Sequence, residues 1–172
     1  MTIQLEGRAR VIGDDINTDY IIASTRKRDT LDASVLKRFL LETVDPAFAA
    51  SVREGDVLVA GRNFGCGSAM EVAATVILAA GIRSVLARSY SRTFFRNAIN
   101  NGLIPVECDT SQVKEGDRVS VRLDRGTLDV SNLATGRIVT GAPLPGIVLA
   151  ILECGGLVPY IRRHGHWPAV ER

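Results

Sequence analysis

Three short apolar segments, alternating with two segments of helical pattern, restrict the fold of this chain more than any other feature of its sequence. The apolar segments are 56–60, 84–87 and 103–106. The residues between them predict helices over 69–80 and 91–101, and Gly81 and Gly102 follow where a left-handed residue ends a helix. This order requires parallel strands joined by right-handed crossovers. The sequence therefore predicts the α/β class, with a parallel βαβαβ core whose apolar strands are covered on both faces.

The character of the sequence changes near residue 107. Between 113 and 140, short alternating segments separated by glycine-containing turns predict an additional β meander, and a first strand around 7–12 is a candidate to join it. An earlier helix is predicted over 32–44, because apolar residues recur on one of its faces and Asp32 is suited to cap its start.

The chain contains no repeat, no low-complexity tract and no linker that would divide it. A last apolar segment at 147–152 is followed by two glycines and a predicted short helix at 157–163. We therefore expect a single domain over 1–172, with a core of about 5–163 and a frayed tail at 164–172.

The charge of the chain argues against two classes of partner. Its 172 residues include 21 Lys and Arg and 19 Asp and Glu, a formal net charge of +2. This balance leaves no basic footprint for nucleic acid and no polybasic surface for a membrane. No apolar run reaches the roughly 18 to 20 residues that span a bilayer, and the first residues lack the pattern of a signal peptide. We expect a cytoplasmic protein that binds neither.

The cysteines are Cys66, Cys108 and Cys154, an odd number spread some forty residues apart. They form neither a disulfide framework nor a clustered zinc or iron–sulfur signature. We therefore assign no metal-binding and no cofactor-binding residue to this chain, and any metal chemistry needs ligands from elsewhere.

The segment 61–71, Gly-Arg-Asn-Phe-Gly-Cys-Gly-Ser-Ala-Met-Glu, lies between a predicted strand and a predicted helix. Loops in this position bind ligands in α/β sheets, and the helix N-terminus favours an anion. A structural interpretation competes, because Ser68 and Glu71 match a capping box, and spacing alone favours that cap. The glycines match neither a Walker A loop nor a dinucleotide fingerprint.

Two polar segments precede this loop. The acidic segment 13–22 is compatible with a calcium-like loop or with Asx turns, and the missing distal Glu favours turns. The basic segment 24–29, Ser-Thr-Arg-Lys-Arg-Asp, is compatible with solvated surface or with a clamp for a carboxylate or phosphate.

Four motifs occur in one order: Gly-Asp-Asp-Ile-Asn-Thr-Asp-Tyr-Ile-Ile at 13–22, Gly-Arg-Asn-Phe-Gly-Cys-Gly-Ser at 61–68, Ser-Tyr-Ser-Arg-Thr-Phe-Phe-Arg-Asn at 89–97 and Asn-Gly-Leu-Ile-Pro-Val at 101–106. With them, the chain resembles the small subunits of 3-isopropylmalate dehydratase (isopropylmalate isomerase), which are similar to the swivelling C-terminal domain of aconitase. The resemblance covers about residues 5 to 163. It implies an aconitase swivelling-domain-like β/β/α fold.

The resemblance implies half of an enzyme. In this family a separate large subunit holds a [4Fe–4S] cluster on three cysteines, and the small subunit closes over it. Together the subunits isomerise a 2-hydroxy di- or tricarboxylic acid by dehydration and rehydration, with 3-isopropylmalate and leucine biosynthesis as the default. Ser68 matches the serine that removes the proton from carbon, and the amides around Gly65 and Gly67 are expected to stabilise its alkoxide and bind substrate.

One departure from the family concerns substrate binding. Relatives have an arginine that grips a substrate carboxylate where this chain has Met70. Arg28 lies in the loop by which the family selects substrate side chains, and Arg26, Lys27 and Arg28 together favour a polar or anionic substituent. Arg92 is a further candidate for a displaced carboxylate contact. The expected substrate-binding residues are therefore Arg26, Arg28, Gly65, Gly67 and Arg92.

Two alternatives to the default function remain open. The first keeps the reaction and changes the acid, to a homoaconitase-like substrate or a substituted malate such as dimethylmalate. The second is a non-catalytic binding module that keeps the fold and has lost the chemistry. Met70 supports the module, whereas Ser68 and the glycines around it oppose it.

Overall fold

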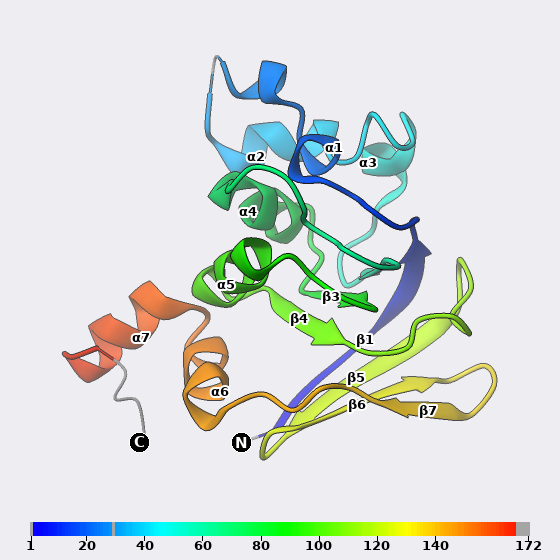
Figure 1. Ribbon diagram of the computed structural model, residues 1–172, viewed down its shortest axis with the longest axis vertical. Helices are drawn as coiled ribbons and strands as arrows, with labels where there is room; N and C mark the ends of the chain where they lie inside the picture. The colour runs from blue at the N-terminus through cyan, green and yellow to red at the C-terminus, as the bar shows by residue number, and fades with distance from the viewer. Residues whose placement is uncertain (1, 29, 168–172) are drawn as a thin grey trace.

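The structure, a computed structural model, describes residues 2–28 and 30–167 and is built around one seven-stranded sheet with the order β4-β3-β2-β1-β5-β6-β7 (Figure 1). The strands are β1 (Thr2–Val11), β2 (Val57–Val59), β3 (Ser84–Ala87), β4 (Ile104–Glu107), β5 (Arg118–Asp124), β6 (Thr127–Asn132) and β7 (Arg137–Thr140). The helices are α1 (Thr18–Ile21), α2 (Ala33–Leu36), α3 (Phe48–Ser51), α4 (Glu71–Ala79), α5 (Arg92–Asn101), α6 (Gly146–Glu153) and α7 (Leu157–His164), with 3₁₀ turns at Ser24–Lys27 and Lys37–Phe39.

The predicted parallel core is confirmed. β1, β2, β3 and β4 pair in parallel, and α4 and α5 are the crossovers between the last three of them. Successive side chains of a strand point to opposite faces, so the apolar runs feed two cores. Leu58 and Val85 are buried in one core with α2 and α4, whereas Val57, Val59 and Leu86 are buried in the other with the meander.

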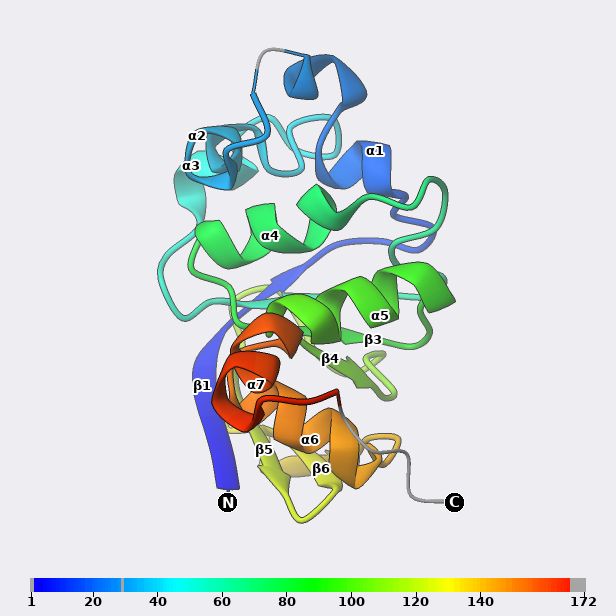
Figure 2. The ribbon, with the colours of Figure 1, turned by 90° about the vertical axis from the view of Figure 1, so that its left-hand side faces the viewer.

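β1 joins the two halves of the sheet. Its first part, 2–8, pairs antiparallel with β5, and its last part, 9–11, pairs in parallel with β2. The predicted meander is confirmed as β5, β6 and β7, at the lower end of the molecule in Figure 1, with α6 and α7 beside it. Figure 2 shows α1 to α4 gathered at the opposite end, above the parallel strands.

The predicted helix over 32–44 is wrong beyond its first turns. Asp32 does cap α2, accepting a hydrogen bond from the Ser34 amide at 2.8 Å. The chain then tightens into a 3₁₀ turn, and Leu41 takes a positive φ of 56°. The Leu41 amide donates to the Ile21 carbonyl at 3.0 Å, so a contact distant in the sequence replaces the helical hydrogen bond. Periodicity alone could not reveal that partner.

Two further differences concern the ends of helices. α4 begins at Glu71, two residues later than predicted, which changes the surroundings of Ser68. The predicted short helix at 157–163 is confirmed as α7, which includes His164 and is capped by Gly165 at φ 73°. The rest of the predicted tail, 168–172, lies outside the described residues, as do residues 1 and 29.

Across residues 2–28 and 30–167, none of the helices is long and apolar enough to cross a membrane.

Candidate active site

The loop between β2 and α4, residues 60–70, lies at the carboxyl edge of the parallel strands, where α/β sheets place their ligand sites. The segments that follow β1 and β3 end at the same edge and contact this loop through isolated bridges, Asn17 with Cys66 and Phe64 with Tyr90. Segments far apart in the sequence thus meet around one loop.

The acidic segment holds this loop from one side. The Thr18 amide donates to the Cys66 carbonyl at 2.9 Å, and its hydroxyl donates to the Ser68 carbonyl, also at 2.9 Å. The Gly65 amide donates to the Ile16 carbonyl at 2.8 Å. The backbone on both sides of Cys66 is therefore fixed, and Ser68 is held through its carbonyl rather than its hydroxyl.

The carboxylates of the acidic segment also bind the loop between β2 and α4. Asp14 accepts a hydrogen bond from the Arg62 amide at 2.7 Å, and Asp15 accepts one from the Asn63 side chain at 2.9 Å. Asn17 caps α1 by accepting from the Tyr20 amide at 2.9 Å. These contacts support the turn interpretation of segment 13–22 over the calcium loop.

The segment before α5 holds the loop from the other side. Ser91 caps α5, and its hydroxyl also donates to the Gly65 carbonyl at 2.6 Å. The Phe64 amide donates to the Ser89 carbonyl at 3.0 Å, and the Phe64 ring meets Phe94 edge-on at 4.9 Å. Gly65 is buried at φ 73°, and a Cβ there would lie 2.2 Å from Phe94. Packing alone therefore requires glycine at this position.

Ser68 does not cap α4, so the capping-box interpretation is wrong. The N-cap is Met70, in extended conformation and without a side-chain cap, and Glu71 is the first helical residue rather than the third. The Ser68 carbonyl accepts a hydrogen bond from the Thr18 hydroxyl before the helix begins. Ser68 is exposed, and its hydroxyl forms no hydrogen bond within the described part of the chain.

The backbone around Ser68 offers a row of free donors. No amide from residue 67 to residue 71 donates a hydrogen bond to any residue that the structure describes. Gly67 is exposed and has a φ of 89°, which turns the chain just before Ser68. Free amides and the positive end of α4 favour negative charge here. The arrangement can stabilise an anion on or beside the Ser68 hydroxyl.

The three cations of the basic segment have different surroundings. Arg26 forms a two-point ion pair with Glu42, at 2.8 and 2.9 Å, and its guanidinium lies 4.0 Å above the Phe39 ring. Arg28 is exposed and forms no ion pair with the described residues. The charge of Arg26 is therefore balanced within the chain, although the sequence marks it equally with Arg28.

Lys27 is the cation that faces α4. Its ammonium contacts the sulfur of Met70. A hollow of about 450 Å³ is lined by Lys27, Leu31, Met70, Glu71, Val72 and Thr75. The sequence does not distinguish Lys27 from Arg26 and Arg28, because the 3₁₀ turn at Ser24–Lys27 determines which of these side chains faces the helix.

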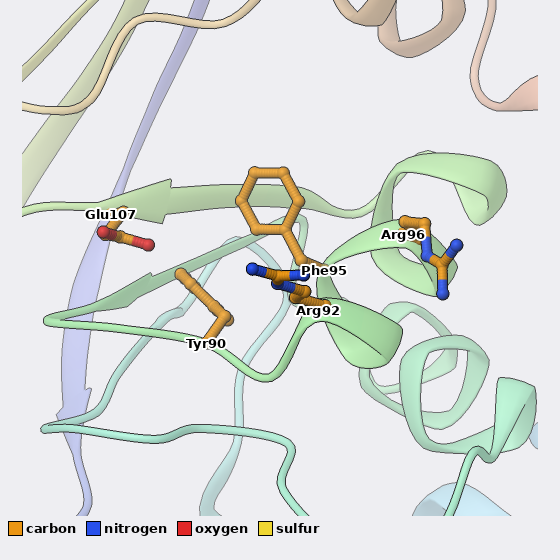
Figure 3. Close-up of a pocket in the computed structure, with 5 residues that line it drawn as sticks. All are labelled: Tyr90, Arg92, Phe95, Arg96 and Glu107. Atoms are coloured by element: carbon orange, nitrogen blue, oxygen red, sulfur yellow. The ribbon is translucent and has the colours of Figure 1, made fainter.

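Arg92 lies elsewhere. It is the first residue of α5 and lines a second hollow, of about 490 Å³, with Tyr90, Phe95, Arg96 and Glu107. Figure 3 shows the Arg92 side chain beside Phe95 and Tyr90, with Arg96 further along α5. The two hollows share no lining residue, so the structure does not bring Arg92 together with Lys27 and Met70.

The cysteines do not form a metal centre. Cys66 is partly buried in the glycine loop, and Cys108 is buried, with burial raising the pKa of its thiol to about 12. Within the described ranges, 2–28 and 30–167, no three His, Cys, Asp or Glu side chains are grouped to hold a metal ion. The three cysteines and the other potential ligands among the described residues do not fit an iron–sulfur cluster.

Comparisons with known proteins cover almost the whole chain. The model of the aconitase C-terminal domain family matches residues 14–111. A "3-isopropylmalate dehydratase small subunit 1" from Methanopyrus kandleri is 47% identical over 163 residues, 94% of each chain. A "methanogen homoaconitase small subunit" from Methanocaldococcus jannaschii is 41% identical over 92% of each chain. The crystal structure of a 3-isopropylmalate dehydratase from the same organism superposes with a TM-score of 0.89 at 39% identity, covering 95% of this chain and 96% of that one.

Proposed function

The chain belongs to the aconitase C-terminal domain family, among the small subunits of 3-isopropylmalate dehydratase and their relatives, and we propose that it is the small subunit of a two-subunit hydro-lyase. The predicted swivel-domain fold is confirmed by the likeness to the solved relative. We take 3-isopropylmalate as the default substrate and leucine biosynthesis as the default pathway, with a cytoplasmic location. The observation that carries the proposal is the uncapped, exposed Ser68 beside a row of free amides.

The chemistry assigned to this chain is proton transfer at carbon. As an alkoxide, Ser68 Oγ takes the proton from the carbon next to the hydroxyl-bearing carbon, and the electrons of that C–H bond form the C=C bond as the hydroxyl leaves. The amides of residues 67–71 and the start of α4 offset the charge on Oγ before the proton arrives. Addition of water across the double bond in the opposite sense completes the isomerisation.

The proposal requires a partner. The exposed position of Ser68 leaves its hydroxyl accessible to a second chain, and we propose that such a chain completes the site. Family membership supports a large subunit that carries a [4Fe–4S] cluster, which supplies a Lewis acid for the leaving hydroxyl. We propose a heterodimer in which the single domain of this chain closes over that subunit.

A second candidate keeps the reaction and changes the acid. Relatives of similar identity include an "isopropylmalate/citramalate isomerase small subunit" and the homoaconitase small subunit, so the fold serves different acids. The side chain at position 70 is the specific observation that favours a change, because Met70 offers no charge to a carboxylate. A homoaconitase-like acid or a substituted malate such as dimethylmalate is the alternative substrate.

Reconstitution tests the proposal. The chain is combined anaerobically with a cluster-loaded large subunit from the same source, and formation of the unsaturated intermediate is followed by absorbance. The acids are 3-isopropylmalate, citramalate, homocitrate and dimethylmalate. Turnover of 3-isopropylmalate supports the default, and turnover of another acid alone supports the second candidate. A verified complex that acts on none of them contradicts the proposal and leaves the non-catalytic module.

A further inference from the structure

The carboxyl edge of the parallel strands carries four exposed arginines that the proposed chemistry does not use. Two lie in the segments that follow β2 and β3, and two lie one turn apart at the start of α5. We call this set the arginine edge, and its members are Arg62, Arg88, Arg92 and Arg96. Apart from a contact of 3.7 Å between Arg88 and Asp109, none of the four forms an ion pair with a residue that the structure describes. The edge therefore presents positive charge that the described residues leave largely unpaired.

Two hollows lie along the arginine edge. The first, of about 490 Å³, is lined by Tyr90, Arg92, Phe95, Arg96 and Glu107. The second, of about 510 Å³, is lined by Arg62, Arg88, Cys108, Asp109 and Ser111. They are neighbours, because Glu107 lines one and the next residue, Cys108, lines the other. Each hollow holds two arginines and one carboxylate, so each is complementary to a surface with an excess of acid.

The aromatic wall of the first hollow is fixed by contacts within the chain. The Tyr90 ring meets Phe95 at a centroid distance of 5.6 Å, and its hydroxyl donates to the Val85 carbonyl at 2.5 Å. Tyr90 thus offers its ring, and not its hydroxyl, to the hollow, and Figure 3 shows Arg92 beside both rings. Aromatic residues and arginine contribute most to binding at protein interfaces. A wall that is already ordered loses little conformational entropy when a partner binds.

The arginine edge is continuous with the loop that carries Ser68. Arg62 belongs to this loop. Ser91, which precedes Arg92, donates its hydroxyl to the Gly65 carbonyl at 2.6 Å and so joins the start of α5 to the same loop. A second chain that covers Ser68 therefore has the arginine edge as the adjoining surface.

We infer that the arginine edge binds an acidic segment of the large subunit, with a carboxylate side chain entering the hollow of Arg92 and Arg96. This inference rests on the proposed function and names the surface by which the chain recognises its partner. A guanidinium suits this task, because it pairs with a carboxylate at two points and stacks on aromatic rings. Nucleic acid does not fit the edge, since Glu107 and Asp109 interrupt its positive charge and the net charge of the chain is only +2.

Titration with the cluster-loaded large subunit tests the inference. Arg92→Glu and Arg96→Glu are each expected to raise the Kd of the complex by about tenfold to a hundredfold, because an attractive charge pair becomes a repulsive one. The matched control is Arg83→Glu, which reverses an exposed arginine just before β3, at the opposite edge of the sheet, and is expected to change Kd less than about twofold. Circular dichroism checks that each variant is folded. An unchanged Kd in both Arg92→Glu and Arg96→Glu overturns the inference.

The salt dependence of the same titration tests the electrostatic origin of the affinity. Between about 50 and 500 mM NaCl, we expect the wild-type Kd to rise at least about tenfold, because salt screens exposed charge pairs. The double variant Arg92→Glu with Arg96→Glu is expected to show a weaker salt dependence. An equal salt dependence in the two proteins contradicts an acidic partner for these two arginines.

Cross-linking tests the chemical nature of the partner group. Carbodiimide joins an amine directly to a carboxylate, so Arg92→Lys and Arg96→Lys are expected to become linked at the substituted position to an Asp or Glu of the large subunit. Mass spectrometry identifies the linked peptides. The control Arg83→Lys is expected to give no link at position 83. An assembled complex with no link from position 92 or position 96 overturns the acidic segment.

Kinetics separates this inference from the proposed function. Where the wild-type complex turns over an acid, the activity lost in Arg96→Glu is expected to return with excess large subunit, because the defect lies in assembly. A KM for the acid that stays raised in the saturated Arg92→Glu complex assigns Arg92 to the substrate and overturns the inference. If the wild-type complex forms but turns over no acid, and charge reversal weakens it, the proposed function fails and the inference survives. Failure of the two wild-type subunits to associate overturns both.

Discussion

At the scale of single residues, the hydroxyl of Ser68 caps no helix because α4 begins only at Glu71. Spacing marks it as a cap, and the family resemblance marks it as a base, so the sequence alone leaves two roles. The structure rules out the cap, because the N-cap of α4 is Met70, and the Ser68 carbonyl instead accepts a hydrogen bond from the Thr18 hydroxyl. That bond joins residues fifty positions apart, which local pattern cannot reveal.

Ser68→Ala separates the two roles experimentally. In the reconstituted complex we expect kcat to fall about 10²- to 10⁴-fold, because a general base is lost. The thermal unfolding midpoint of the isolated chain is expected to stay within a degree or so of wild type, since loss of a real cap costs about 1 kcal/mol. The matched control is Ser131→Ala on β6, distant from the loop. Full activity of Ser68→Ala rejects the base.

Replacing Gly65 or Gly67 by alanine is expected to lower the stability of the folded chain by different amounts. Gly65→Ala places a Cβ 2.2 Å from the buried Phe94 ring in addition to a positive φ, so we expect about 2–5 kcal/mol of lost stability. A Cβ at position 67 would lie 3.5 Å from its nearest neighbour, so only the φ of 89° opposes alanine there, at about 1–2 kcal/mol. Urea denaturation of both variants measures the difference. Equal costs contradict the packing explanation of Gly65.

At the scale of elements, β2, β3 and β4 are predictable to within about two residues, because apolar runs between glycine-ended helices leave one arrangement. The segment 24–44 is not predictable in the same way. Its 3₁₀ turns and the positive φ of Leu41 accompany two contacts distant in the sequence, the Leu41 amide with the Ile21 carbonyl and Arg26 with Glu42. Lys27 lies in this segment, which is why its direction toward Met70 follows from the structure and not from the sequence.

A buried ion pair joins β1 to the segment before β2. Arg8 contacts Asp56 at 2.7 Å and Arg10 contacts it at 3.5 Å, while Asp56 is only 4% exposed. Burial raises the pKa of Asp56, but the hydrogen bonds from Arg8 and from the Arg53 amide, with the charges of Arg8 and Arg10, outweigh burial and hold the pKa below its usual 3.8. The charged form of Asp56 therefore stabilises the folded chain.

This pair predicts a pH dependence. A depressed folded pKa contributes stability above the unfolded value, and that contribution is lost as the pH falls through the folded pKa. We expect Asp56→Asn to lower the unfolding free energy by about 1–3 kcal/mol at pH 7, because Arg8 and Arg10 lose a charged partner while Arg10 keeps Glu115. The gap to wild type should narrow below about pH 4, the ordinary range of an aspartate. Urea titrations at several pH values check this, and a constant gap contradicts it.

At the scale of the whole molecule, the two cores share their strands. Leu58 packs in the core under α2 and α4, and its neighbours on β2 pack in the core that includes the meander. A sheet whose central strands feed both cores is expected to unfold as one unit. The change near residue 107 that is visible in the sequence coincides with a change from parallel to antiparallel strand pairing, and we propose that it is not a domain boundary.

Two core variants test whether the chain unfolds in a single cooperative transition. Leu58→Ala and Leu123→Ala each empty a buried site, in different cores, at 0% and 3% exposure. Both are expected to lower the same single unfolding transition by about 2–5 kcal/mol. Circular dichroism in urea, with hydrogen exchange as a second probe, measures the number of transitions. A variant that splits the transition into two steps shows that the cores are independent domains.

The pairing of β1 with β5 has a consequence for biosynthesis. The first residues of β1 meet the last residues of β5, and Thr2 and Asp124 are 122 positions apart. At translation speeds of roughly 5–20 residues per second, β1 emerges from the ribosome about 6–24 s before its partner. The edge of β1 that pairs with β5 therefore stays unpaired during synthesis, and the sheet closes only after the meander has left the exit tunnel.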